Sequence, residues 1–151
     1  MANTAAVCTS FKTELLNGIH AFGTTVVRGA TTKDTLKAAI YFASATLGAA
    51  TTAYSASGEV TNSGDYTAGG ATVTNATAPS ATGTTAFWTP SAAIAFTGVT
   101  WAAFDALLLY NSTQSNKAVA VFNFGSQSVT AGNVTLNMPT NDATTGLLRL
   151  A

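Results

Sequence analysis

One stretch of sequence decides the fold class: Ala106-Leu107-Leu108-Leu109-Tyr110-Asn111-Ser112-Thr113-Gln114-Ser115-Asn116-Lys117-Ala118-Val119-Ala120-Val121-Phe122-Asn123-Phe124. Two apolar runs, 106–110 and 117–124, lie on either side of the polar hexapeptide 111–116. Short apolar runs joined by such a polar segment are typical of two antiparallel strands and their hairpin loop. The stretch therefore predicts a β-hairpin.

Shorter strands are predicted on both sides of this hairpin. The apolar residues recur with a period of two, the spacing of a half-buried strand. The predicted strands cover 24–28, 35–42, 71–77, 84–88, 94–96, 99–101, 133–138 and 147–150. Residues 44–70 are predicted as a long irregular excursion with one turn of helix near 49–54, and 79–83 and 125–132 as loops.

The N-terminal residues follow a different pattern. Residues 1–8 are predicted to form an uncharged arm, and a short helix follows, capped by Thr9 or Ser10. Its apolar stripe is Phe11, Leu15 and Ile19. With a turn signal about every 8–12 residues elsewhere, the sequence predicts one mainly β domain, 1–151. The expected architecture is an antiparallel β-sandwich, jelly-roll-like, with one short N-terminal helix.

The composition excludes several functional classes. Among 151 residues, six Lys and Arg face six Asp and Glu, too few cations to displace the counterions of a nucleic acid. Cys8 is the single cysteine, so a disulfide framework is excluded. The most apolar stretch, 92–110, is broken by polar residues, which argues against a transmembrane helix. A neutral surface rich in Thr and Ala suits a chain that is permanently assembled, or one covered by hydroxyl-rich β-structure.

Residues for catalysis are scarce. His20 is the single histidine, and it lies in an apolar segment that offers no Ser-His-Asp arrangement. We expect His20 to be a partly buried residue at a helix end and Cys8 to be a small buried hydrophobe. One cysteine and one histidine are also too few ligands for a zinc site. The sequence therefore predicts a protein that is not an enzyme and that carries no cofactor.

One loop gathers oxygen ligands. Its candidate residues are Glu59, Asn62, Asp65 and Tyr66. Calcium takes six to eight oxygens, but the alternating Asp/Asn pattern of a calcium loop is absent, and a solvated surface loop is the favoured interpretation. The two carboxylates are equally weak candidates for a glycosidase pair.

The aromatic residues offer a binding surface. Trp88 and Trp101, together with Phe87, Phe96 and Phe104, fit core packing or a subunit interface better than a sugar-stacking platform. The candidate interface residues are Val7, Phe11, Trp88, Trp101 and Phe104.

Several segments resemble a family of small virion proteins of tailed bacteriophages. The opening 7–18 carries the resemblance, as do Thr51-Thr52-Ala53-Tyr54, Gly58-Glu59-Val60 and Tyr66-Thr67-Ala68-Gly69-Gly70. So do the runs 106–111 and 116–121 of the hairpin. The resemblance implies a β-sandwich that decorates or cements the phage head, and it brings no catalytic residues.

The resemblance also implies a partner and a location. The expected partner is the major capsid protein, bound by a homo-oligomer, with a trimer favoured, on a local symmetry axis of the head surface. No nucleic acid and no membrane are expected as partners. Two alternatives remain open: a tail or fibre component that acts as an adaptor or binds a receptor, and a carbohydrate-binding module.

Overall fold

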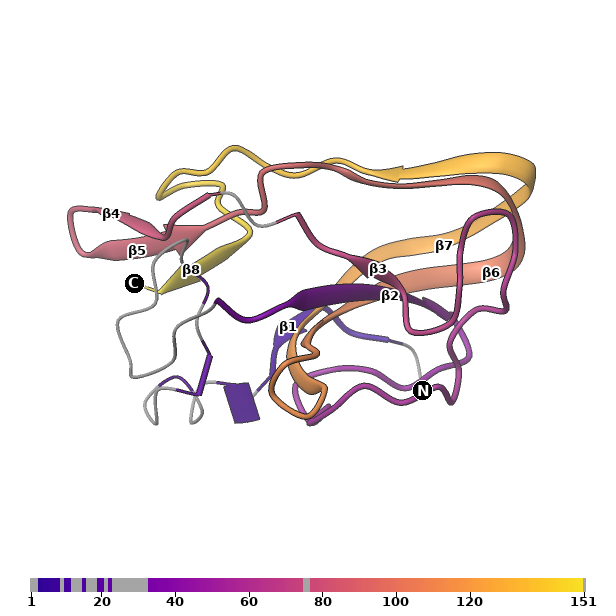
Figure 1. Ribbon diagram of the computed structural model, residues 1–151, viewed down its shortest axis with the longest axis horizontal. Helices are drawn as coiled ribbons and strands as arrows, with labels where there is room; N and C mark the ends of the chain where they lie inside the picture. The colour runs from indigo at the N-terminus through magenta and orange to yellow at the C-terminus, as the bar shows by residue number, and fades with distance from the viewer. Residues whose placement is uncertain are drawn as a thin grey trace.

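The computed structural model describes residues 3–8, 10–11, 15, 19–20, 22, 33–74 and 77–150 and is mainly β. Its strands are β1 (Ala6–Val7), β2 (Leu36–Phe42), β3 (Ala71–Thr72), β4 (Ser80–Thr82), β5 (Thr85–Trp88), β6 (Ile94–Asn111), β7 (Lys117–Leu136) and β8 (Leu148–Leu150). They form two antiparallel sheets, in the orders β1-β7-β6-β2-β3 and β4-β5-β8 (Figure 1). In the described part of the chain, no helix is long and apolar enough to cross a membrane.

The predicted hairpin is confirmed as the pairing of β6 with β7. Leu107 faces Phe122 and Leu109 faces Ala120 across the two strands. The loop between them closes through a hydrogen bond from the Lys117 amide to the Gln114 carbonyl oxygen, 3.1 Å. Consecutive residues of this region, 104–111 and 118–121, are buried on both faces of the sheet, so the hairpin forms the centre of the larger sheet.

The hairpin is much longer than the sequence predicted. The loop predicted over 125–132 is wrong, because these residues are part of β7, and the separate pieces predicted over 94–96 and 99–101 are parts of one strand, β6. The β6–β7 ladder is interrupted by several register shifts, and pairing resumes after each of them. Gly98, Ala103, Gly125 and Ala131 lie in the left-handed region of φ along these strands. Such bulges bend a strand and increase its twist while pairing resumes beyond them.

The bulges divide the hairpin into two halves. We call residues 104–124 the near half, because it contains the turn, and residues 94–103 with 125–136 the far half. Figure 1 shows the far half bent back so that it lies over the near half and β2. Ile94 and Phe96 of the far half are buried, as are Leu107 and Leu109 of the near half. One hairpin therefore contributes strands to both faces of the same apolar core.

The other strand predictions are partly confirmed. β2, β5 and β8 lie within the strands predicted over 35–42, 84–88 and 147–150. Of the described residues in the strand predicted over 71–77, Ala71–Thr72 form β3, and 75–76 lie outside the described residues. The predicted loop 79–83 contains β4, which pairs with β5. The helical turn predicted near 49–54 is wrong, because the backbone there forms a single turn with an amide-to-carbonyl hydrogen bond from Thr51 to Gly48, 3.0 Å.

The N-terminal segment is docked on its own chain. β1 pairs with β7, and the Cys8 amide donates to the Val119 carbonyl oxygen, 3.2 Å. The Thr4 amide donates to the Leu47 carbonyl oxygen, 3.0 Å. Residues 3–8 of the predicted arm are thus held in the fold. Most of the predicted N-terminal helix and the strand predicted over 24–28 lie outside the described residues, and of the helix only Ser10, Phe11 and Leu15 are described as helical.

The long excursion between β2 and β3 is held by close backbone contacts at two glycines. A Cβ atom on Gly70 would lie 2.0 Å from the Ala38 carbonyl oxygen, and one on Gly64 would lie 2.1 Å from the Thr97 carbonyl oxygen. Both glycines also have a positive φ, which side chains disfavour. The excursion can approach β2 and β6 this closely only because these positions lack a side chain.

We expect Gly70→Ala to destabilise the protein severely, because the new methyl group would overlap backbone atoms of β2. Gly83→Ala is the matched control: Gly83 also has a positive φ but has open space around it, so only the left-handed strain of about 1–2 kcal/mol applies. Chemical denaturation measures both effects. Equal losses of stability in the two variants would contradict the close approach at Gly70.

Candidate interaction surfaces

The five candidate interface residues do not form one surface. Trp101 and Phe104 are buried in the core, with 3% of each side chain exposed. The Trp101 indole Nε1 donates to the Thr61 carbonyl oxygen, 2.8 Å, and its ring meets that of Tyr66 edge to face. Trp101 and Phe104 are therefore core residues, and the sugar-stacking platform that would need them at the surface is not formed.

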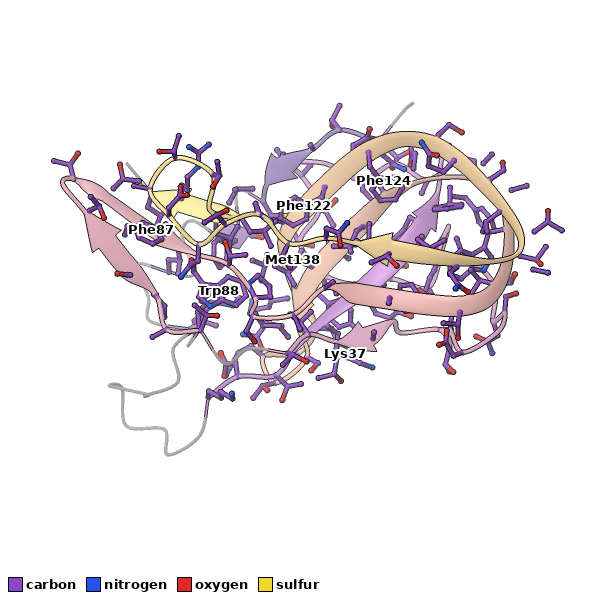
Figure 2. The ribbon with its side chains drawn as sticks, turned by 90° about the horizontal axis from the view of Figure 1, so that it is seen from above. Lys37, Phe87, Trp88, Phe122, Phe124 and Met138 are labelled. Atoms are coloured by element: carbon purple, nitrogen blue, oxygen red, sulfur yellow. The ribbon has the colours of Figure 1, made fainter. Side chains whose placement is uncertain are left out.

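The other three candidates, Val7, Phe11 and Trp88, line one apolar pocket of about 260 Å³. The pocket lies between the N-terminal segment and the small sheet, where Figure 2 labels Trp88 and its neighbour Phe87. Phe22 meets both Phe11 and Trp88 edge to face, with ring centroids 5.5 and 5.1 Å apart. The sequence thus identified three residues of a real concavity, although it gave no sign that they would meet.

The wall of this pocket is rigid on the side of the small sheet. The Trp88 indole Nε1 donates to the Thr77 carbonyl oxygen, 3.1 Å. The Leu147 amide, at the start of the segment that leads into β8, donates to the Thr89 hydroxyl, 2.9 Å. Leu150 closes the rim with 52% of its side chain exposed, and among the described residues it is the one large apolar side chain with such exposure. A concave apolar wall with an exposed leucine at its rim suits contact with another apolar side chain.

His20 lies in a buried polar cluster rather than in a catalytic arrangement. The Asn111 amide Nδ2 donates to Asp34 Oδ2, 2.7 Å, and lies 3.0 Å from His20 Nδ1. The Gln114 amide Nε2 donates to Asp34 Oδ1, 3.1 Å. His20 is 8% exposed and thus buried, not partly buried as expected. The cluster ties the hairpin turn to the segment that precedes β2.

A second buried carboxylate anchors the N-terminus. Asp105 accepts hydrogen bonds from Nδ2 of Asn3, 2.5 Å, and from Nδ2 of Asn123, 3.1 Å. The Asn3 side-chain oxygen in turn accepts from the Leu47 amide, 2.8 Å. Because Asn3 bonds to two separate parts of the sheet and its loops, the first described residue of the chain is part of the core.

The predicted solvated loop is confirmed at Asn62 and Asp65, which are exposed, but it is wrong at Glu59 and Tyr66, which are buried. Glu59 is 7% exposed, and its two oxygens accept hydrogen bonds from three donors: the Tyr54 hydroxyl, 2.6 Å, the Tyr66 hydroxyl, 2.6 Å, and the Gly69 amide, 2.7 Å. A carboxylate whose oxygens are bound by hydroxyl and amide donors is not arranged to hold a cation. Within the described ranges, no group of three or more His, Cys, Asp or Glu lies close enough to hold a metal ion.

All four tyrosines of the chain surround this carboxylate. Tyr41 donates to the Ser55 carbonyl oxygen, 2.5 Å, and Tyr110 donates to the Gly69 carbonyl oxygen, 2.6 Å. The rings of Tyr54 and Tyr110 stack, with centroids 4.8 Å apart. The tyrosines of β2 and β6 thus hold the excursion from one side, and those within the excursion bind Glu59 from the other.

Asp65, the second acid of the predicted metal loop, has a separate role. Its carboxylate accepts from the Thr97 amide, 2.8 Å, and from the Thr97 hydroxyl, 2.7 Å. These hydrogen bonds to Thr97 hold the pKa of Asp65 below its usual value. Asp65 is exposed and accepts from Thr97 of β6, whereas Glu59 is buried among the tyrosines.

We expect the protein to lose stability as the pH rises above about 10, the ordinary pKa of tyrosine. Burial raises the pKa of Tyr41 and of Tyr66, and for Tyr66 the hydrogen bond to Glu59 adds to the shift. A raised pKa in the folded state means that the unfolded state loses its protons first, so the contribution is intact below pH 10 and is lost above it. Absorbance at 295 nm, which detects tyrosinate, is measured together with circular dichroism. Tyrosinate forming near pH 10 in protein that stays folded would contradict this.

A second concavity, of about 270 Å³, lies beside β7 and reaches between the two halves of the hairpin. Phe122, Phe124 and Met138 line it, and each is half-buried (Figure 2). The described part of the chain thus carries one apolar concavity at the small sheet and another at the hairpin. No protein-family model, no curated protein and no solved structure matches the chain.

Proposed function

We propose that this chain is a non-enzymatic structural protein of a bacteriophage virion, which binds the lattice of the major capsid protein on the head surface and stabilises it. The proposal begins from the family resemblance of the sequence. The bent hairpin, with strands on both faces of the core, supports a β-sandwich of the jelly-roll-like kind as the architecture.

One observation carries the proposal: the long hairpin of β6 and β7 has almost no charged residues. From Ile94 to Asn141, only Asp105 and Lys117 are charged, and Asp105 is buried. A surface of Thr, Ser, Asn and Ala docks on a shell without the cost of removing ions from water. Copies crowded on one lattice would also not repel each other through this surface.

The first pocket supports contact between copies of the chain. Val7, Phe11 and Trp88 form an apolar wall, and Leu150 stands exposed at its rim. Apolar concavities with aromatic anchors are common centres of subunit interfaces. We assign this pocket to the homo-oligomer, whose many copies would bind the shell through repeated weak contacts.

The alternatives receive less support from the geometry. A carbohydrate-binding module needs exposed aromatic rings, but Trp101 and Phe104 are in the core and Trp88 is 3% exposed. A tail or fibre component needs the same kind of rigid β-scaffold as a head protein, and it differs from one in copy number. The number of copies per particle therefore separates the two structural roles.

We expect quantitative mass spectrometry of purified virions to find this chain in a copy number comparable to that of the major shell protein. A protein that decorates the shell repeats with the lattice, which is the physical reason for this count. The shell protein of the same sample is the internal standard. A count many-fold lower would place the chain at a vertex, neck or tail, and its absence from particles would refute a virion role.

We also expect particles assembled without this chain to release their DNA at a lower temperature than complete particles. A protein that bridges neighbouring shell subunits opposes the internal pressure of the DNA, so its removal lowers the barrier to rupture. Release is measured with a DNA-binding dye during a temperature ramp. Restoring the purified chain to the particles is the control, and identical release temperatures would refute the stabilising role.

A further inference from the structure

The two halves of the hairpin differ in width on the side of β7. In the near half, β1 pairs with β7 at Ala120 and Val121 and extends the sheet by one strand. In the far half, β7 pairs with β6 and with no further strand of the described chain. Viewed from above, Phe122 and Phe124 of the near half lie beside the far half of β7, with no ribbon drawn over them (Figure 2). On the side of β7, the near half therefore has one strand more, β1, than the far half that lies over it.

This difference leaves an apolar ledge. The ledge consists of four apolar side chains that line the second concavity: Phe122, Phe124, Leu136 and Met138. All four side chains are half-buried, in contrast to the buried Leu107 and Leu109 that line the same concavity deeper in the core. Within the described chain, no segment covers the outer side of this part of the core.

The rim of the ledge is a strand edge. In the stretch Gly132–Leu136, the backbone pairs with β6 on one side, and no backbone hydrogen bond to another described segment is formed on its other side. The bulge at Ala131 ends this stretch at one end, and Pro139 follows it at the other. Val134–Leu136 pair in regular register with Ile94–Phe96, and Gly132 pairs with Val99 beyond a register shift.

This edge has no charged gatekeeper. Natural edge strands are usually protected by Lys, by Pro or by an inward-pointing charge, which prevent pairing with another chain. Between Lys117 and Asp142 there is no charged residue at all. Val134 and Leu136 point to the core side, and Asn133 and Thr135 are exposed. An added extended segment in which apolar and polar residues alternate would continue the apolar inner face and the polar outer face of the far half.

We propose that an extended segment of the major capsid protein adds as a strand to Gly132–Leu136 and covers the ledge with alternate apolar side chains. The inference rests on the proposed function, because it names where the shell protein binds. The occupant is a polypeptide because the free edge offers main-chain N–H and C=O groups in the spacing of a strand. The segment is uncharged where it faces the chain, since the ledge has no ion to pair with a charge.

A second copy of this chain is not the occupant. Pairing two copies through this edge about a two-fold axis would bring their two near halves together first, because the near half is the wider one on this side. A separate, narrow segment reaches the edge without that obstacle. A sugar or a lipid would leave the main-chain groups of the edge without partners, which costs free energy wherever the interface excludes water.

The test uses particles assembled without this chain as the probe, to which the purified full-length chain and its variants are bound. Met138→Lys places a charge on the ledge, and we expect its affinity for the particles to fall at least tenfold. Thr82→Lys is the matched control: it adds the same charge to an exposed residue of β4, in the other sheet, and we expect binding within twofold of the wild type. Thermal unfolding of both variants establishes that they are folded.

A second measurement on the wild type does not depend on any substitution. Hydrogen exchange, followed by mass spectrometry, is compared for the free and the particle-bound chain, and we expect the amides of Gly132–Leu136 to exchange at least tenfold more slowly when bound. Unchanged exchange there, or wild-type affinity in Met138→Lys, overturns the inference while leaving the proposed function intact. If the wild-type chain does not bind the particles at all, the proposed function itself fails, and the inference with it.

Discussion

The bend of the β6–β7 hairpin is the constraint on which the rest of the structure depends. Without the bulges near Gly98, Ala103, Gly125 and Ala131, two strands of this length would form a straight ribbon with one face in water. The bend lets Ile94 and Phe96 of the far half share a core with Leu107 and Leu109 of the near half. The remaining elements, from the N-terminal segment to the excursion after β2, then pack around a core that one hairpin has already enclosed.

Burial of carboxylates explains how a chain with so few charges holds its loops. Asp34, Glu59 and Asp105 are all buried, and each binds a different segment: the turn of the hairpin, the excursion and the N-terminus. Their described hydrogen-bond donors are amides and hydroxyls. Hydrogen bonds to a charged acceptor are stronger than those between neutral groups. Three of the six acids of the chain are thus used inside the fold rather than on its surface.

The sequence predicted those features that depend on neighbours along the chain. Apolar alternation located β2, and continuous apolar runs located the near half of the hairpin, where consecutive residues are buried. It failed at 125–132, because both faces of β7 are largely exposed there and Ser126, Gln127 and Ser128 resemble a loop. The burial of Glu59 was also missed. Two of its donors, Tyr54 and Tyr66, are near it in sequence, but only the fold brings Tyr41 and Tyr110 to the same cluster. Trp88 and Phe11 were found by residue type, yet their meeting in one pocket depends on the docked N-terminus.

The continuity of the hairpin has a mechanical consequence. In a sandwich of two independent sheets, a force that pulls one layer outward is resisted by side-chain packing alone. Here β6 and β7 each run without a break from the far half into the near half. The same force is therefore carried along these two strands into the sheet that contains β2. To peel the far half away, the bulges must straighten, and covalent chain joins both layers throughout. A load applied at the outer layer is thus carried by the covalent backbone and distributed over the whole domain, instead of being borne by side-chain contacts between two layers.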